Sequence, residues 1–256
     1  MANLAILGLK TTSADELMKT RDKILLSSLE LFNEQGERNV TTNHIAAHLA
    51  ISPGNLYYHF RNKSDIIYEI FQEYEKLVDF YLDIPENRPM TLGDMTFYLE
   101  SVFDGLWSYR FFHRDLEYLL DRDTRLRGDY REFTNRCLAA ISRIFVKLAD
   151  AGIIEPQSAS LRAAMSLNVW LVITNWMAYL KTAHAAKASA SLTLHELKQG
   201  IYQVLTLEMP YLTPGHREQV MVLREKYRPT MPECEEARET SASLENNCSP
   251  CSAVKN

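Results

Sequence analysis

The spacing of apolar positions predicts helices along almost the whole chain. From Ser13 to Gly36 apolar residues recur at close to the 3.6-residue period of a helix, and Gly36 is a suitable residue to end it. No stretch of useful length alternates apolar and polar residues as a strand would. The 9 glycines and 9 prolines are few for 256 residues, which favours helices over a turn-rich fold. We therefore expect an all-α fold.

Two short helices joined by a tight turn are predicted next. The first spans about Thr42–Ala50, and the second opens at Ser52 and Pro53. A serine can cap the exposed N–H groups at a helix start, and a proline fits the first turn because its missing N–H has no helical partner there. A longer helix over about Asn62–Leu82 follows, so this region has the order of a helix-turn-helix unit.

Pro85 and Pro89 interrupt the chain and mark the best boundary between two units. Longer helices are expected beyond them, near Thr91–Ser108, Phe111–Asp121, Arg125–Ala151, Ser158–His184 and Thr193–Met209, with a shorter one near Gly215–Tyr227. From Arg228 the composition turns polar, which is typical of disorder. The expected divisions are an extension (1–19), a three-helix unit (20–82, helix-turn-helix at about 41–60), a helical domain (90–227) and a disordered tail (228–256).

Charge is distributed unevenly. The whole chain has a net charge of −5, yet no Asp or Glu occurs between Arg38 and Ser64. The same segment holds Arg38, Arg61, Lys63 and the histidines at positions 44, 48 and 59. A locally positive surface on an acidic protein is where an anionic partner would be attracted.

The second short helix has the side chains that DNA recognition needs. Asn55 can offer paired donor and acceptor groups to adenine, and Gly54 would let the backbone approach the duplex closely. Tyr57 and Tyr58 combine a hydroxyl with a ring that can contact a thymine methyl group. The expected DNA-contacting residues are Thr42, Ser52, Gly54, Asn55, Tyr57, Tyr58, His59 and Lys63, of which Thr42, Ser52, His59 and Lys63 suit phosphates.

Leu56 and Phe60 lie four residues apart on the opposite face and are expected in the core, against Leu29, Phe32, Ile45 and Leu49. His44 and His48 have the spacing of metal ligands, but no third ligand lies nearby. A solvent-facing or phosphate-facing role is the better interpretation, and we expect no metal site.

This block resembles the DNA-binding domain of the TetR family of bacterial transcriptional regulators. The resemblance covers about Thr20 to Gln72. It is carried by Phe32, Gly36, Val40-Thr41-Thr42, Ile45-Ala46, the run from Ile51 to Phe60 (ISPGNLYYHF), Lys63 and Ile66. Pro53 departs from the pattern, because members often have a basic or small polar residue there. The resemblance implies an Ω-shaped homodimer whose recognition helices enter successive major grooves. It also implies that the C-terminal helices hold a small-molecule pocket and the dimer contact.

The second unit is rich in aromatic residues, most of which we expect in the core. A pocket for an apolar effector needs such walls and a few polar anchors. Arg110, His113 and Arg114 stand beside Phe111 and could hold an anion such as a carboxylate or the phosphate of a thioester carrier. The expected ligand-binding residues are Trp107, Arg110, Phe111, His113, Arg114, Trp170 and Trp176.

The two most apolar helices, Ser158–His184 and Thr193–Met209, carry small residues at Ala163, Ala164 and Ala178 that would allow close approach. They could form a four-helix interface between two copies or pack within one chain. The pattern leaves both open.

Catalytic motifs are weak. His113-Arg114-Asp115-Leu116 resembles a kinase catalytic loop, but Leu120 stands where the metal-binding Asn should be. Cys248 and Cys251 form a pair with no second pair nearby. We expect neither an enzyme nor a cofactor.

No membrane segment is expected, because Asn168, Thr174 and Asn175 interrupt the most apolar stretch. Met1 to Lys10 lacks a basic region and a clear cleavage site, so we expect no secretion signal and a cytoplasmic protein. The four cysteines suggest no disulfide framework.

These patterns favour a regulator, with repression expected over activation. It would bind an inverted-repeat operator in double-stranded DNA as a homodimer and respond to a small apolar or acyl-type effector. Two alternatives stay open: a helical ligand or lipid carrier with a vestigial helix-turn-helix, and an architectural DNA-binding protein without an effector. The operator, the effector and the regulated genes are not specified by these patterns.

Overall fold

The computed structural model of the chain describes residues 19–183 and 192–229. Within these ranges the regular elements are helices, accompanied by one isolated bridge between Ile154 and Leu212. The expected all-α fold is confirmed. The expected helix start at Ser13 and most of the expected tail lie outside the described residues.

The described residues of the first part form the helices α3 (Thr20–Gln35), α4 (Thr42–His48), α5 (Pro53–His59) and α6 (Lys63–Tyr81). The second part contains α7 (Leu92–Ser108), α8 (Arg110–Arg122), α9 (Thr124–Asp150), α10 (Ala159–Ala183), α11 (Leu194–Lys198), α12 (Gly200–Glu208) and α13 (Pro214–Glu225). Short 3-10 turns lie at Glu37–Asn39 and Met209–Tyr211.

The helix starts follow local capping chemistry. The Asn62 side chain accepts a hydrogen bond from the Asp65 N–H at 2.9 Å and caps α6. Thr193 and Glu196 form a reciprocal capping box at the start of α11. Gly36 follows α3 with a φ of 87°, a conformation that favours glycine. These boundaries could be predicted because each cap is made by residues three positions apart or closer.

The helix expected over Thr193–Met209 is divided. One helix ends at Lys198 and the next begins at Gly200. A Cβ atom at Gly200 would lie 2.6 Å from the Phe103 ring and 2.7 Å from the Trp176 ring. The break between α11 and α12 thus lies where the Phe103 and Trp176 rings pack against the backbone. The sequence around Gly200 does not indicate this packing, because both rings come from other helices.

Two groups of buried residues form the core. The first joins α3–α6 to α8 and the first half of α9, around Phe32, Phe71 and Phe112. Phe71 lies 5.3 Å from Phe112 and 5.8 Å from Phe133, measured between ring centroids. The second joins α7, the end of α9 and α10–α13. The first core thus contains residues from both sides of the loop at Pro85 and Pro89. The expected divisions at 20–82 and 90–227 therefore stay a prediction.

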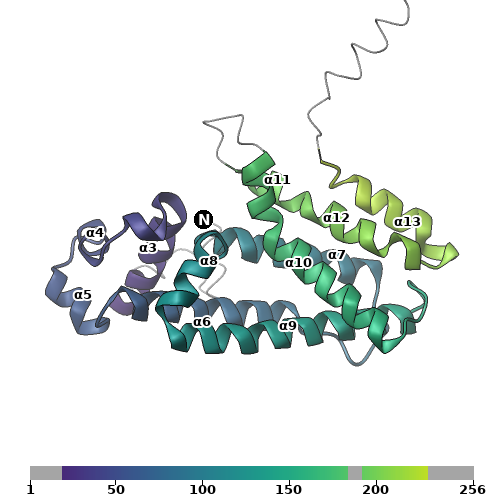
Figure 1. Cartoon of the computed structure of the whole chain (residues 1–256), viewed down its shortest axis with the longest axis horizontal. Coiled ribbons are helices and arrows are strands. Elements are labelled where there is room, and N and C mark those ends of the chain that lie inside the picture. Colours follow the sequence, from purple (N-terminus) through teal and green to yellow (C-terminus); the bar gives the residue numbers. More distant parts are fainter. Residues whose placement is uncertain (1–18, 184–191, 230–256) are drawn as a thin grey trace, which may run out of the picture.

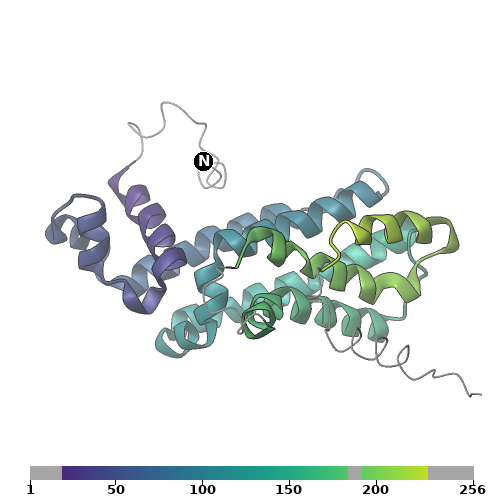
Figure 2. The same cartoon turned by 90° about the horizontal axis from the view of Figure 1, so that it is seen from above.

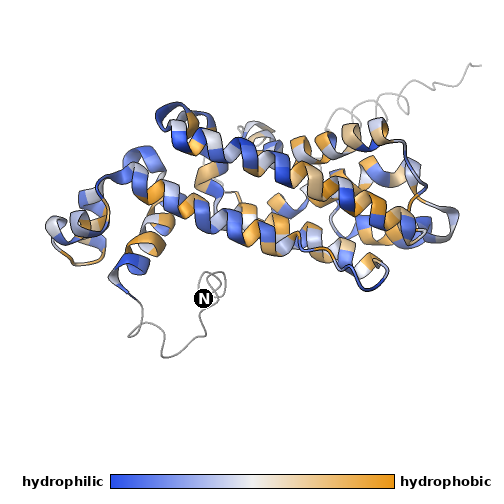
Figure 3. Ribbon diagram, turned by 90° about the horizontal axis from the view of Figure 1, so that it is seen from below, coloured by the Kyte–Doolittle hydropathy of each residue, from blue (hydrophilic) through white to orange (hydrophobic). Residues whose placement is uncertain are grey.

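The molecule is elongated, with α3–α5 at one end and α12 and α13 towards the other (Figures 1 and 2). Helix α6 leaves the helix-turn-helix end and runs beside α9, to which it is joined by an ion pair between Glu75 and Arg136 at 2.8 Å. Along the ribbon, hydrophilic residues are frequent in α3–α5, and apolar residues are more frequent in the opposite half (Figure 3).

Helix α10 is long and apolar enough to cross a membrane by length and composition alone. The core helix of a soluble protein meets the same criterion. Here one face of α10 packs in the second core through Met165, Val169, Ile173 and Met177, while Leu167 and Leu171 lie on the open face.

Candidate functional site

Helix α5 begins with the cap that its sequence predicts. The Ser52 hydroxyl accepts a hydrogen bond from the Asn55 N–H at 3.1 Å, and Pro53 occupies the first turn. Gly54 and Asn55 in this turn and Tyr58 in the next are exposed, and Tyr58 is 84% exposed. A Cβ at Gly54 would meet only the Ser52 hydroxyl, at 3.9 Å. The N-terminal half of α5 is therefore an open polar surface.

The opposite face of α5 anchors it. Leu56 and Phe60 are 0% and 3% exposed and belong to the first core with Ile45 and Phe32. Their expected core role is confirmed. Because Leu56 lies between Asn55 and Tyr57, burying it turns its neighbours outwards.

Tyr57 also links the two short helices. Its hydroxyl lies 2.9 Å from the Thr42 hydroxyl, in a hydrogen bond that either atom can donate. Tyr57 is 48% exposed, so it remains accessible while its hydroxyl joins α5 to α4. His59 is half-buried and contacts the Tyr58 ring edge-on.

Lys63 is placed differently from the expected phosphate contact. Its ammonium group donates to the Glu37 and Val40 carbonyls, each at 3.0 Å, and pairs with the Glu37 carboxylate at 2.6 Å. An ammonium group has three N–H donors, and these contacts use all of them. Lys63 therefore holds the start of α6 against the turn after α3.

The other basic residues of the acid-free segment differ in availability. Arg38 lies over the Tyr118 ring at 4.0 Å and near Asp115 at 3.8 Å. Arg61 is exposed, and so are His44 and His48. No group of three or more metal-ligating side chains occurs within 19–183 and 192–229. Arg61 and the two histidines are thus accessible basic side chains in the same segment as Lys63.

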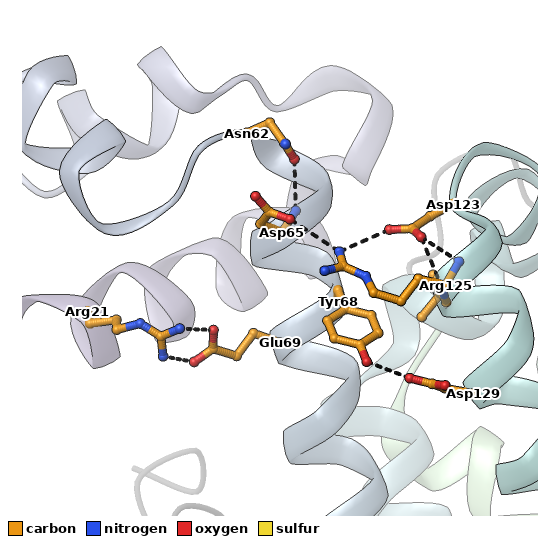
Figure 4. A network of polar contacts seen from close by, with 9 residues as sticks. Arg21, Asn62, Asp65, Tyr68, Glu69, Asp123, Arg125 and Asp129 are labelled. Carbon is orange, nitrogen blue, oxygen red and sulfur yellow. Dashed lines mark hydrogen bonds and ion pairs between the residues drawn. The ribbon is translucent and has the colours of Figure 1, made fainter.

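A polar network joins the helix-turn-helix unit to the body (Figure 4). Arg125 of α9 pairs with Asp65 of α6 at 3.2 Å and lies over the Tyr68 ring at 3.7 Å. Tyr68 in turn donates to Asp129, and Arg21 of α3 pairs with Glu69. Helix α6 thus contacts both α3 and α9 through one short stretch.

A second link joins the end of α3 to the start of α8. The Asn33 side chain donates to the Ser108 carbonyl at 2.7 Å and accepts from the Phe111 N–H at 3.0 Å. Arg114 donates to the Phe32 carbonyl at 2.9 Å. The last turn of α3 and the start of α8 are therefore joined by three hydrogen bonds.

Three of the expected ligand-binding residues meet at this junction. Trp107, Arg110 and Arg114 line one cavity of about 420 Å³. Met177 and Lys181 of α10 line it too, and neither is among the residues predicted from the sequence. Their positions along α10 do not indicate a pocket, because only the tertiary packing brings α10 against α8.

The other four expected residues lie elsewhere. Phe111 is fully buried in the first core, and Trp170 packs on Phe133. His113 is buried with its Nε2 atom 2.9 Å from the Tyr74 hydroxyl, and this burial lowers the pKa of His113 to about 4. Trp176 packs against Tyr179. These side chains are better explained as packing residues than as parts of one pocket.

The fold and the exposed α5 define a helix-turn-helix protein with a helical second domain. A family model described as bacterial regulatory proteins, tetR family, matches residues 24–70. A second, described as bacterial transcriptional repressor and named TetR, matches residues 73–220, more than half of the chain. The chain belongs to the TetR family of DNA-binding transcriptional regulators.

Individual relatives agree. A TetR-family transcriptional regulator from Marinobacter aquaeolei VT8 is 84% identical, with a TM-score of 0.78, and the match covers 83% of this chain and 100% of that one. SmeT, the repressor of the Stenotrophomonas maltophilia multidrug efflux pump SmeDEF, shares the fold at 19% identity and a TM-score of 0.53, covering 77% of this chain and 93% of that one.

A curated relative matches over a short part of the chain. An HTH-type transcriptional regulator of Staphylococcus aureus (strain USA300) is 41% identical over 54 residues, which is 21% of this chain. The match spans 29% of that relative's length. The chain thus covers less than a third of that relative.

Proposed function

We propose that the protein is a ligand-responsive repressor that binds an inverted-repeat operator as a homodimer in the cytoplasm and has no enzymatic activity. The observation that carries the proposal is the exposed face of α5, which presents Gly54, Asn55 and Tyr58 on the side opposite the buried Leu56 and Phe60. Repression is supported by the description of the family model over residues 73–220, bacterial transcriptional repressor.

Asn55 is the proposed base-reading residue. It lies in the first turn of α5, where a recognition helix contacts base edges, and its side chain is exposed. An amide can pair with adenine through one donor and one acceptor. Ser52, Thr42, His59 and Arg61 flank it on the same unit and are proposed to contact phosphates or sugars.

Replacing Asn55 by alanine is expected to weaken operator binding by about 1–3 kcal/mol and to relax the preference at one base pair of each half-site. The operator would first be selected from randomised duplexes with the wild-type protein, and affinities measured by fluorescence anisotropy. Thermal stability should stay unchanged, because the Asn55 side chain is exposed.

The control is Asn135→Ala, which removes an exposed amide from α9, far along the chain from α5. It should leave affinity and base preference at wild-type values. Recovery of no inverted repeat in the selection, or equal binding by Asn55→Ala and wild type, would refute the proposed recognition helix. Ligand binding without any salt-dependent DNA binding would instead point to a carrier.

The proposed dimer contact is the open face of α10. Leu167, Leu171 and Tyr179 are 46%, 48% and 54% exposed and recur one or two helical turns apart. Ala163, Ala164 and Ala178 lie exposed on the same helix, where small side chains would let a partner helix approach. Exposed apolar patches of this kind mark protein–protein contacts. The pattern suits a partner α10 from a second copy.

Replacing Leu171 by glutamate is expected to weaken dimerisation by about 2 kcal/mol, because a charge would be placed at the centre of an apolar contact. Analytical ultracentrifugation across protein concentrations would measure the shift, and operator affinity should fall with it. Glu132→Gln, an exposed substitution on α9, is the control. A monomeric wild-type protein, or an unaltered dimer in Leu171→Glu, would exclude this face.

We propose that the effector binds in the cavity between α3, α8 and α10. Trp107 and Met177 supply apolar wall, as expected for an apolar or acyl-type molecule. Binding would change the separation of the two recognition helices. Coupling free energies between such sites are typically about 1–3 kcal/mol.

A further inference from the structure

The cavity at the junction of α3, α8 and α10 has an unusual charge distribution. Three cationic side chains line it: Arg110, Arg114 and Lys181. Glu34 is the one carboxylate among the residues that line this cavity. Arg114 also contacts Asp115 at 3.1 Å, whereas Arg110 is held by the Trp107 carbonyl at 3.1 Å and stacks over the Trp107 ring. The cavity therefore has more positive than negative charge.

The cations also repel one another. Burial, followed by the charge of Arg114, lowers the pKa of Arg110, and Glu34 opposes this shift. Partial burial, followed by the same Arg114 charge, lowers the pKa of Lys181, and Asp115 opposes this shift. A group of cations drawn together in a partly enclosed space is stabilised by an anion that pairs with them.

The remaining walls limit the kind of anion. Trp107, Met177 and Leu192 line the same cavity with apolar surface. A volume of about 420 Å³ is within the range of small-molecule sites. An inorganic ion would leave this apolar surface without contact, whereas a molecule with a charged head and an apolar body would cover both kinds of wall.

We propose that the effector is an organic anion with an apolar body, whose acidic head pairs with Arg110, Arg114 and Lys181 and whose body packs on Trp107, Met177 and Leu192. This deepens the proposed function and rests on it, because it names the chemical class of the effector and the route by which it acts.

The route begins at Arg114. The same guanidinium group lines the cavity and donates to the Phe32 carbonyl in the last turn of α3. Asn33, the next residue, also lines the cavity and holds the backbone where α7 meets α8. An anion that pairs with the remaining N–H groups of Arg114 attracts the guanidinium group towards the cavity and away from the Phe32 carbonyl, so it loosens α3 and with it the position of α4 and α5. Operator affinity falls as a result.

The binding test compares octanoate with octanamide, which has the same apolar chain and no charge. Isothermal titration calorimetry with the full chain should show octanoate binding at least about tenfold more tightly. The double variant Arg110→Gln/Lys181→Gln should remove that preference. Arg143→Gln, an exposed cation on α9, is the matched control and should keep it. Equal binding of the two ligands to wild type, or no octanoate binding at millimolar concentration, overturns the proposal without reference to any variant.

The coupling test measures operator affinity with and without octanoate. Wild type should lose affinity by about fivefold or more, and the double variant, compared with its own ligand-free affinity, should not respond. A preference for octanoate with unaltered operator affinity overturns the proposed route through Arg114. Failure of the proposed function looks different: the wild-type protein would then select no operator at all, while the calorimetric preference for octanoate would persist.

Discussion

Replacing Lys63 by methionine is expected to lower the free energy of unfolding by about 3–5 kcal/mol. The Lys63 ammonium lies 2.6 Å from the Glu37 carboxylate, whose side chain is 3% exposed. The second Glu37 oxygen has no hydrogen-bond partner among the described residues. Removing Lys63 would leave a buried carboxylate with no counter-charge, and such a loss is costly because water cannot replace the missing partner. Urea denaturation measures the change.

Two further variants separate this effect from a general loss of charge. Lys76→Met removes an exposed lysine that pairs with Glu73 on the same helix, and it should alter stability by no more than about 0.5 kcal/mol. The double variant Lys63→Met/Glu37→Gln should recover much of the loss, since the buried charge is gone. A stable Lys63→Met protein with weaker binding to every DNA sequence would instead restore the phosphate role expected from sequence.

The second large effect is a fall in stability with rising pH caused by Glu208. This residue of α12 is 5% exposed and lines a narrow apolar cavity of about 50 Å³ with Val102, Ile173 and others. Burial raises the pKa of the Glu208 carboxyl from its ordinary 4.5 to about 8. The folded protein therefore holds a proton that the unfolded chain releases, and stability is lost as the pH rises between these values.

The buried His113 acts in the opposite direction. Its pKa is lowered to about 4 from 6.5, so its contribution is present above pH 6.5 and is lost on acidification towards pH 4. Between pH 6.5 and 8 Glu208 therefore acts without His113. Each pH unit in that window lowers stability by up to about 1.4 kcal/mol.

Urea denaturation between pH 6.5 and 8 should show wild type losing about 2 kcal/mol. Glu208→Gln should lack this slope and exceed wild type in stability above pH 8, because glutamine cannot ionise. Glu132→Gln, which removes an exposed carboxylate, should retain the wild-type slope. Parallel slopes for wild type and Glu208→Gln would show that Glu208 titrates as an exposed carboxyl does.

The helix-turn-helix unit could be predicted from sequence because its signals are local. Ser52 caps α5 through a residue three positions away, and Leu56 and Phe60 mark the buried face by their spacing. The bounds of α6 and α7 were predictable for the same reason, through the caps at Asn62 and Thr91.

The candidate pocket was predictable only in part. Trp107, Arg110 and Arg114 are close in sequence and share the end of α7 and the start of α8, so they were found together. Phe111, the residue after Arg110, was predicted in the same pocket because it is aromatic, but its side chain is buried in the core. Lys181 comes from α10, and only the packing of α10 against α8 brings it to Arg114.

The sequence by itself determined the helical class, most helix ends and the exposed face of α5, because hydrophobic period and capping act over a few residues. The tertiary structure alone decided that Lys63 is neutralised by Glu37, 26 residues away, and that Glu208 is buried in an apolar cavity. Charge and burial depend on what other helices bring to a side chain, and no local pattern records those neighbours.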